Sequence, residues 1–99
     1  MKLNIQSIHF DADQKLLDLI QDKADKLDQF FDKIVSGEVF LRLEKSDSRD
    51  NKLVEIKLIV PGNDLFASKR SSSFEESADE AIAALRRQVK KLKERLKDH

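Results

Sequence analysis

The chain has 99 residues with a formal net charge of zero, of which 38% are charged and only three are Pro or Gly. This length suits one domain, here residues 1–99, with one modest core and long regular elements. The absence of cysteine excludes disulfides, thiolate metal sites and cysteine nucleophiles. Because the N-terminus turns polar too soon for a signal peptide and no apolar run approaches the ~20 residues that span a bilayer, we expect a cytoplasmic protein without membrane contact.

The first third of the chain predicts a strand followed by a helix. Residues 2–8 alternate between apolar and polar side chains, which indicates a short strand. Asp11 and Asp13 follow as N-cap candidates, and from Gln14 apolar residues recur at three- and four-residue steps to about Val35. The buried stripe of this helix is expected to comprise Leu16, Leu17, Ile20, Ala24, Leu27, Phe31 and Ile34.

A break and three further strands occupy the middle of the chain. Ser36–Gly37 interrupts the helical pattern, and Gly37 can take the left-handed conformation that often ends a helix. The strands are predicted at residues 38–45, 53–60 and 64–70. A polar loop over residues 46–51 joins the first two, and Pro61–Gly62 suits a type II turn between the last two. The facing of the final strand is left open by its pattern.

A long helix is predicted at the end of the chain. Either Ser72 with Glu75 or Ser73 with Glu76 forms a capping box, and the helix then continues to about Lys97 without Gly or Pro. At ~1.5 Å per residue it is ~35 Å long, so its last turns should project past the sheet. Its apolar positions are Ala78, Ile82, Leu85, Val89, Leu92 and Leu96.

The order β-α-β-β-β-α defines an α+β fold with a four-stranded sheet. Strands one and two should be parallel, because the first helix crosses between them, and the remaining strands form a meander. Each strand offers one good apolar face, so both helices should pack on one face of the sheet and leave the other in water. Phe40 and Ile59 are predicted on that open face.

Charge collects at the C-terminus. Residues 84–99 hold seven Lys/Arg against two acids, a net charge of +5, whereas residues 1–83 carry a net charge of −5. This asymmetry favours binding to a phosphate backbone, although a solvated helix end with favourable dipole interactions would have a similar composition. The candidate RNA-binding residues of this helix are Arg86, Arg87, Lys90, Lys91, Lys93 and Lys97, which should form a continuous basic surface. In the first helix Lys23 and Lys26 are one turn apart and form either a small basic patch or part of a mixed-charge surface.

Catalytic and metal-binding patterns are lacking in the sequence. His9 and His99 are the only histidines, and neither has a second imidazole at ligand spacing. No nucleophile–base pair and no glycine-rich phosphate loop stands out. We therefore expect no enzymatic activity, no cofactor, no metal and no small-molecule substrate.

Three segments resemble a known family at matching spacing. Residues 1–5, 26–34 and 85–91 are similar to the short ribosome hibernation promoting factors, also called ribosome-associated translation inhibitors or sigma-54 modulation proteins. The resemblance implies a fold like that of double-stranded RNA-binding domains. It also implies binding to the small ribosomal subunit, through ribosomal RNA and ribosomal proteins, in the channel used by messenger RNA and transfer RNA. Such binding would inhibit translation and preserve idle ribosomes in stationary phase, a stress response.

The resemblance also implies which side chains contact ribosomal RNA. Lys23 and Lys26 match the lysines of the family's first helix. The matching positions of the last helix are Arg87, Gln88, Lys91, Lys93 and Lys97. Ser73-Phe74-Glu75 departs from the Asp-hydrophobic-Tyr step with which many members begin this helix. The chain ends at His99 without the further domain of long members, so we expect no ribosome dimerisation by that route.

Two other functions fit parts of the sequence. A generic double-stranded RNA-binding module would use the same fold and the same cations. Alternatively, the four-three spacing from Ala78 to Leu96 is compatible with a coiled-coil seam in a protein-interaction module. We favour a core role for this stripe, because the strands need a cover, and we expect a monomer off the ribosome.

Overall fold

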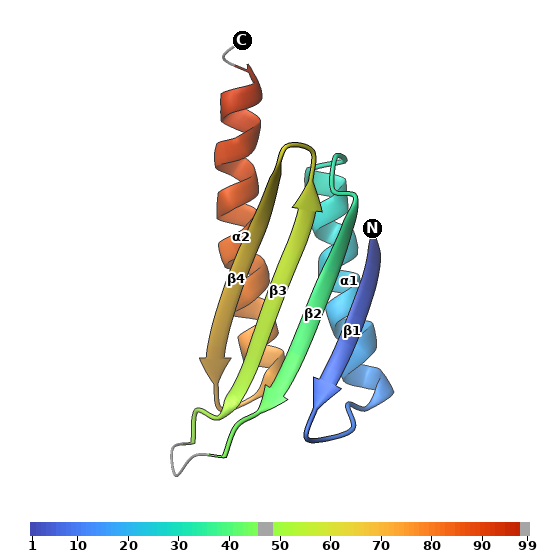
Figure 1. Cartoon of the computed structure of the whole chain (residues 1–99), viewed down its shortest axis with the longest axis vertical. Helices are drawn as coiled ribbons and strands as arrows, with labels where there is room; N and C mark the ends of the chain where they lie inside the picture. The colour runs from blue at the N-terminus through green and yellow to red at the C-terminus, as the bar shows by residue number, and fades with distance from the viewer. Residues whose placement is uncertain (46–48, 98–99) are drawn as a thin grey trace.

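The computed structural model describes residues 1–45 and 49–97, with the side chain of Lys97 excepted. The elements are β1 (Lys2–Ile8), α1 (Gln14–Phe30), β2 (Ser36–Leu43), β3 (Lys52–Val60), β4 (Asn63–Ser71) and α2 (Phe74–Lys97) (Figure 1). This order confirms the predicted α+β fold. Part of the loop expected at residues 46–51 lies outside the described residues.

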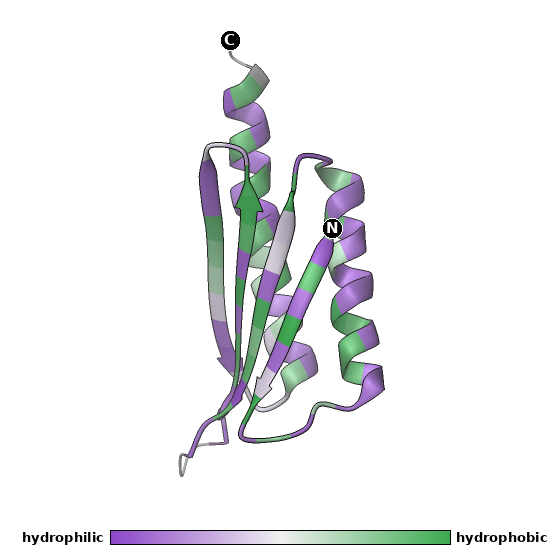
Figure 2. Cartoon of the chain, turned by 45° about the vertical axis from the view of Figure 1, so that its right-hand side comes forward, coloured by the Kyte–Doolittle hydropathy of each residue, from purple (hydrophilic) through white to green (hydrophobic). Residues whose placement is uncertain are grey.

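The four strands form one sheet in the order β1-β2-β3-β4. β1 pairs with β2 in parallel, and the other two pairings are antiparallel. Both helices cover the same face of the sheet, and the opposite face is open (Figure 2). The parallel pair follows from the α1 crossover, which returns the chain to the end of the sheet where β1 began.

The core lies between the sheet and the helices. Inward side chains alternate along the two central strands, and the most deeply buried are Val39, Leu41, Val54, Ile56 and Leu58. Leu65 pairs with Leu58 and Ala67 with Ile56, which turns both β4 residues toward the helices. The facing of β4 is thereby determined, and Phe66 is directed outward with 52% of its surface exposed.

The α1 helix ends earlier than the sequence pattern predicts. Asp13 caps its N-terminus by accepting a hydrogen bond from the Leu16 amide at 2.9 Å, as expected for one of the two candidates. The predicted end near Val35 is wrong, because Phe31 adopts an extended conformation with φ −148° and ψ 110°. Phe31 and Ile34 are nevertheless buried, so the apolar periodicity continues although the helix does not.

Gly37 lies within β2 and is not the left-handed helix cap that was predicted. A Cβ atom at this position would lie 2.7 Å from Leu3 Cδ2 and 3.0 Å from Leu58 Cδ2. Glycine therefore relieves crowding between neighbouring strands. Gly62 does adopt a positive φ of 78°, the value that a type II turn requires at its second central residue.

A buried hydroxyl network joins β3, β4 and α2. Ser77 Oγ donates to the Lys52 carbonyl at 2.7 Å and lies 2.7 Å from Ser71 Oγ. Ser73 is the N-cap of α2, since its Oγ accepts from the Glu76 amide at 3.1 Å. In the predicted capping box the Ser73 amide would donate to the Glu76 side chain, but it donates instead to Ser71 Oγ at 3.3 Å.

The apolar stripe of α2 is core, as favoured above. Ala78, Leu85 and Val89 have no exposed surface, because the sheet covers them, so they are not free to form a coiled-coil seam. The cover ends before the helix does: Leu92 is half-buried, and Leu96 is 46% exposed. The last turns of α2 extend beyond the β3–β4 turn, as predicted from the helix length (Figure 1).

Ser77→Ala should lower the free energy of unfolding by about 1–3 kcal/mol, because it removes a buried hydroxyl and leaves the Lys52 carbonyl without that donor. Urea denaturation followed by circular dichroism measures the change. Ser68→Ala is the matched control, since Ser68 is exposed on the open face and should change stability very little. Equal effects of the two substitutions would contradict a structural role for the network.

Gly37→Asn should destabilise the fold by about 1–3 kcal/mol, because the side chain must displace Leu3 and Leu58 and bury an amide. Gly62→Asn should cost less than about 1 kcal/mol, since asparagine tolerates positive φ and nothing lies within 4 Å of an added Cβ. The same denaturation experiment compares them. Equal stability of the two variants would contradict the crowding assigned to position 37.

Candidate nucleic-acid interface

Phe30, the last residue of α1, holds two cations of α2. The Arg86 guanidinium lies 4.5 Å and the Lys93 ammonium 4.3 Å from the centroid of its ring. Lys93 Nζ also donates to the Phe30 carbonyl at 2.9 Å. Both contacts have a physical cause: an aromatic ring attracts cations, and the last carbonyls of a helix lack intrahelical donors and carry partial negative charge.

Two shallow hollows flank this arrangement. One, of about 140 Å³, is lined by Lys23, Lys26, Leu27, Ile82 and Arg86. The other, of about 210 Å³, is lined by Phe30, Lys90, Lys93 and Glu94. We call Lys26, Phe30, Arg86, Lys90 and Lys93 the Phe30 cluster. It brings together four of the cations predicted from the sequence. Among the described residues, Glu94 is the one acid that lines either hollow.

Lys23 is only partly available to this cluster. Its ammonium forms an ion pair with Asp79 of α2. The residue also lines a hollow with Glu75, Glu76 and Asp79, at the acidic start of α2. A phosphate that approached Lys23 would have to compete with the Asp79 carboxylate, so Lys23 is a weaker candidate than the sequence suggested.

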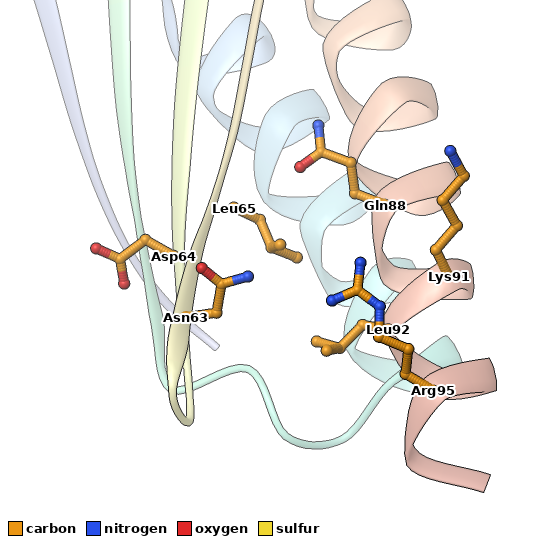
Figure 3. A pocket seen from close by; sticks show the side chains of 7 residues that line it. All are labelled: Asn63, Asp64, Leu65, Gln88, Lys91, Leu92 and Arg95. Carbon is orange, nitrogen blue, oxygen red and sulfur yellow. The ribbon is translucent and has the colours of Figure 1, made fainter. Parts of the chain in front are cut away.

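The remaining cations of α2 lie elsewhere on the helix. Gln88 and Arg95 face β4, and Lys91 lies at the edge of the same hollow; we call these three residues the β4 flank (Figure 3). Gln88 Nε2 donates to the Phe66 carbonyl at 2.8 Å. These residues line a hollow of about 230 Å³ together with Asn63, Asp64, Leu65 and Leu92 (Figure 3).

The cations that were predicted to form one continuous basic surface line different hollows. Lys91 belongs to the β4 flank and does not join the Phe30 cluster, whereas Arg87 is exposed. Lys97 is the last helical residue, and its side chain lies outside the described part of the chain.

Two residues of these surfaces were missed by the sequence reasoning. Phe30 was assigned no role, because an apolar residue inside an apparently continuous helix carries no signal of a cation contact. Arg95 was counted in the basic segment but was not selected as a binding residue. The three- and four-residue spacing of Gln88, Lys91 and Arg95 was the available signal, because it places them on one side of a helix.

The open face of the sheet carries balanced charge. Three ion pairs lie on it: Arg42–Glu55 at 2.7 Å, Lys57–Asp64 at 3.5 Å and Arg70–Glu44 at 2.7 Å. The hydrogen bond from Arg70 to Glu44, with the charge of that carboxylate, raises the pKa of Arg70 above its ordinary value. Phe40 and Ile59 lie on this face half-buried. Pairing neutralises these cations, so they compete little with α2 for phosphate.

The described residues include neither a candidate metal site nor a helix that could span a membrane. No group of three or more His, Asp or Glu side chains is placed there to hold a metal ion. In the same part of the chain, no helix combines the length and apolarity needed to cross a membrane.

Comparison with known proteins extends over nearly the whole chain. The solved structure of a ribosomal subunit interface protein from Coxiella burnetii matches with a TM-score of 0.84 and 20% identity, over 94% of this chain and 98% of that one. The N-terminal domain of Protein Y from Thermus thermophilus matches with a TM-score of 0.75 and 23% identity, over 92% and 94%. At these identities the two structures establish the fold alone.

Sequence relatives are more informative about ancestry. Proteins named ribosome hibernation promoting factor from Klebsiella oxytoca and Escherichia coli K12 are each 31% identical over 99 residues, with both chains fully covered. The family model described as sigma 54 modulation protein / S30EA ribosomal protein matches residues 3–97. The chain therefore belongs to the sigma 54 modulation protein / S30EA ribosomal protein family.

Proposed function

We propose that this protein is a non-enzymatic ribosome-binding factor. It occupies the tRNA/mRNA channel of the small subunit, inhibits translation and preserves idle ribosomes in stationary phase. Its relatives are named for ribosome hibernation, which supports the biological role. The observation that carries the proposal for this chain is the Phe30 cluster, in which the last turn of α1 and the C-terminal half of α2 present cations on one surface.

The chemistry of the cluster suits a phosphate backbone. Lys26, Arg86 and Lys90 are exposed, and Lys93 is held in place by the Phe30 carbonyl. Phosphate contacts of this kind position a protein but read no base sequence, so the shape of the ribosomal channel must supply the specificity. Binding should weaken steeply with salt, because each neutralised phosphate releases condensed counterions.

Inhibition by this protein is steric. The domain extends 49 Å along its longest axis, with α2 projecting at one end (Figure 1). A folded body of this size in the channel excludes messenger RNA and transfer RNA while it is bound. Exclusion requires no catalytic group. The protein acts in the cytoplasm, where ribosomes are, as a single domain that is a monomer when it is off the ribosome.

A generic double-stranded RNA-binding module is the competing function, because the Phe30 cluster would attract any phosphate backbone. The two functions are distinguished by comparing the protein's affinity for plain RNA duplexes with its affinity for small subunits. A hibernation factor should prefer small subunits at the same salt concentration. Equal affinity for both ligands would favour the generic module.

Lys26→Glu with Lys90→Glu should abolish co-sedimentation with purified small ribosomal subunits, because reversed charges on both helices repel phosphate. Lys2→Glu with Lys15→Glu is the matched control, since both lysines are exposed and lie outside the cluster. This pair of substitutions changes the net charge by the same amount as the first pair. Circular dichroism should show that both variants are folded. Retained binding by the first variant, or equal loss in the control, would contradict the assigned interface.

Phe30→Leu should weaken small-subunit binding several-fold, because Arg86 and Lys93 lose the ring that holds them, at about 0.5–1 kcal/mol per exposed contact. Phe30→Tyr keeps an aromatic face and should restore binding. Equilibrium binding and thermal unfolding are measured on both variants. If leucine and tyrosine bind equally well at equal stability, the ring does not position the cations.

A further inference from the structure

We propose that Asp79 is a specificity-determining residue, which weakens binding to plain RNA duplexes by withholding Lys23 from phosphate. This inference rests on the proposed function and deepens it, because it assigns the preference for small subunits over duplexes to named residues. Asp79 itself touches no RNA. It acts through Lys23 and is therefore a positioning residue.

The charge of α2 reverses along the helix. Residues 74–80 contain four acids and no Lys/Arg, residues 81–85 are uncharged, and residues 86–95 contain six Lys/Arg and one acid. α1 lies beside α2, and both helices begin at the end of the sheet where β1 ends (Figure 1). The surface between the two helices therefore has an acidic half near the start of α2 and a basic half near the Phe30 cluster.

Lys23 lies at the boundary between these two halves. It lines the basic hollow of about 140 Å³, together with Lys26, Leu27, Ile82 and Arg86. It also lines a hollow of about 420 Å³, which we call the acidic hollow, together with Leu19, Ser73, Glu75, Glu76 and Asp79. The partner of its ammonium group thus decides whether Lys23 extends the basic half or is neutralised by the acidic half.

That partner is the Asp79 carboxylate. The Lys23 ammonium forms a hydrogen-bonded ion pair with Asp79 Oδ1. The Lys23 side chain is 24% exposed, whereas that of Asp79 is 67% exposed. A phosphate that approaches from solvent therefore meets the carboxylate before it meets the cation. Because ion pairs near the surface are weak, Asp79 competes reversibly with phosphate and does not remove Lys23 permanently.

Two further carboxylates strengthen this competition. Glu75 and Glu76 are exposed in the first turn of α2 and line the acidic hollow with Asp79. Within residues 1–45 and 49–97, neither of them forms an ion pair. Their charges repel phosphate over about 8–10 Å, the Debye length at physiological salt. A phosphate that displaced Asp79 would therefore still be repelled by its neighbours.

The shape of a duplex makes it sensitive to this boundary. An RNA duplex is a rod with phosphates along its whole length, so a duplex that lies along α2 at the Phe30 cluster continues past Lys23 to the acidic hollow. Arg86 and Asp79 are only ~10 Å apart along the helix axis, at ~1.5 Å per residue. Folded RNA in a channel presents its backbone at separate places and can contact the basic half alone. Asp79 therefore opposes duplex binding more than it opposes binding to small subunits.

The test is a double-mutant cycle on the full-length protein. Asp79→Asn removes the carboxylate with little change in volume, Lys23→Gln removes the cation, and the double variant removes both. Glu38→Gln is the control, because Glu38 is exposed on the open face of the sheet and the substitution removes the same charge. Fluorescence anisotropy measures the affinity of each variant for a 20-base-pair RNA duplex and for purified small subunits over a range of salt concentrations. Circular dichroism verifies folding.

Asp79→Asn should raise the affinity for the duplex several-fold. It should also steepen the slope of log affinity against log salt by about 1, because the released Lys23 neutralises one more phosphate. When Lys23→Gln is already present, Asp79→Asn should leave the slope unchanged and raise duplex affinity much less. On small subunits, Asp79→Asn should behave like the Glu38→Gln control.

Four results would overturn the inference. Asp79→Asn would match the control on the duplex, or would raise affinity for both ligands equally, or would have its full effect without Lys23. In the fourth, Asp79→Asn would weaken binding to small subunits, which would indicate that Asp79 contacts a basic protein segment there. Failure of the proposed function is distinguishable, because the unmodified protein would then bind duplexes as tightly as small subunits, whereas the cycle on the duplex reports on Asp79 and Lys23 alone.

Discussion

The rotation of α2 about its own axis is the constraint on which the rest of the structure depends. Ala78, Leu85 and Val89 are fully buried against the sheet, and this burial fixes which side of the helix faces inward. Helix geometry then determines whether each cation lies on the α1 side, the β4 side or the outer face. Hydrophobic packing of these residues thus determines where the cations of residues 86–95 lie. The last turns of the helix extend beyond the sheet (Figure 1).

The early end of α1 also determines where two cations of α2 lie. Because Phe31 is extended, the last helical residue is Phe30, and its carbonyl is available to Lys93. The ring and the carbonyl of one residue hold two cations of the neighbouring helix. The like charges of Arg86 and Lys93, which repel each other, are thereby kept close together. Because their side chains are already held in place, a bound phosphate loses less free energy to side-chain ordering.

The sequence predicted the element order and most inward-facing residues outside β4, because alternating and helical apolar patterns are local. The end of α1 was not predictable, since Phe31 and Ile34 keep helical spacing and burial in a non-helical segment. The role of Gly37 depends on side chains of the neighbouring strands. Lys23 and Asp79 are 56 positions apart in the sequence, and their pairing depends on the contact between α1 and α2. Which hollow each cation of α2 lines likewise depends on what α2 packs against.

The central claim is that the cations of α2 contact ribosomal RNA in the tRNA/mRNA channel of the small subunit. The most direct measurement is a cryo-electron microscopy reconstruction of the full-length protein bound to vacant small subunits. The account predicts density for the domain in that channel, with α2 residues 86–95 against RNA phosphates. A domain bound outside the channel, or one that directs the C-terminal half of α2 toward solvent, would contradict it.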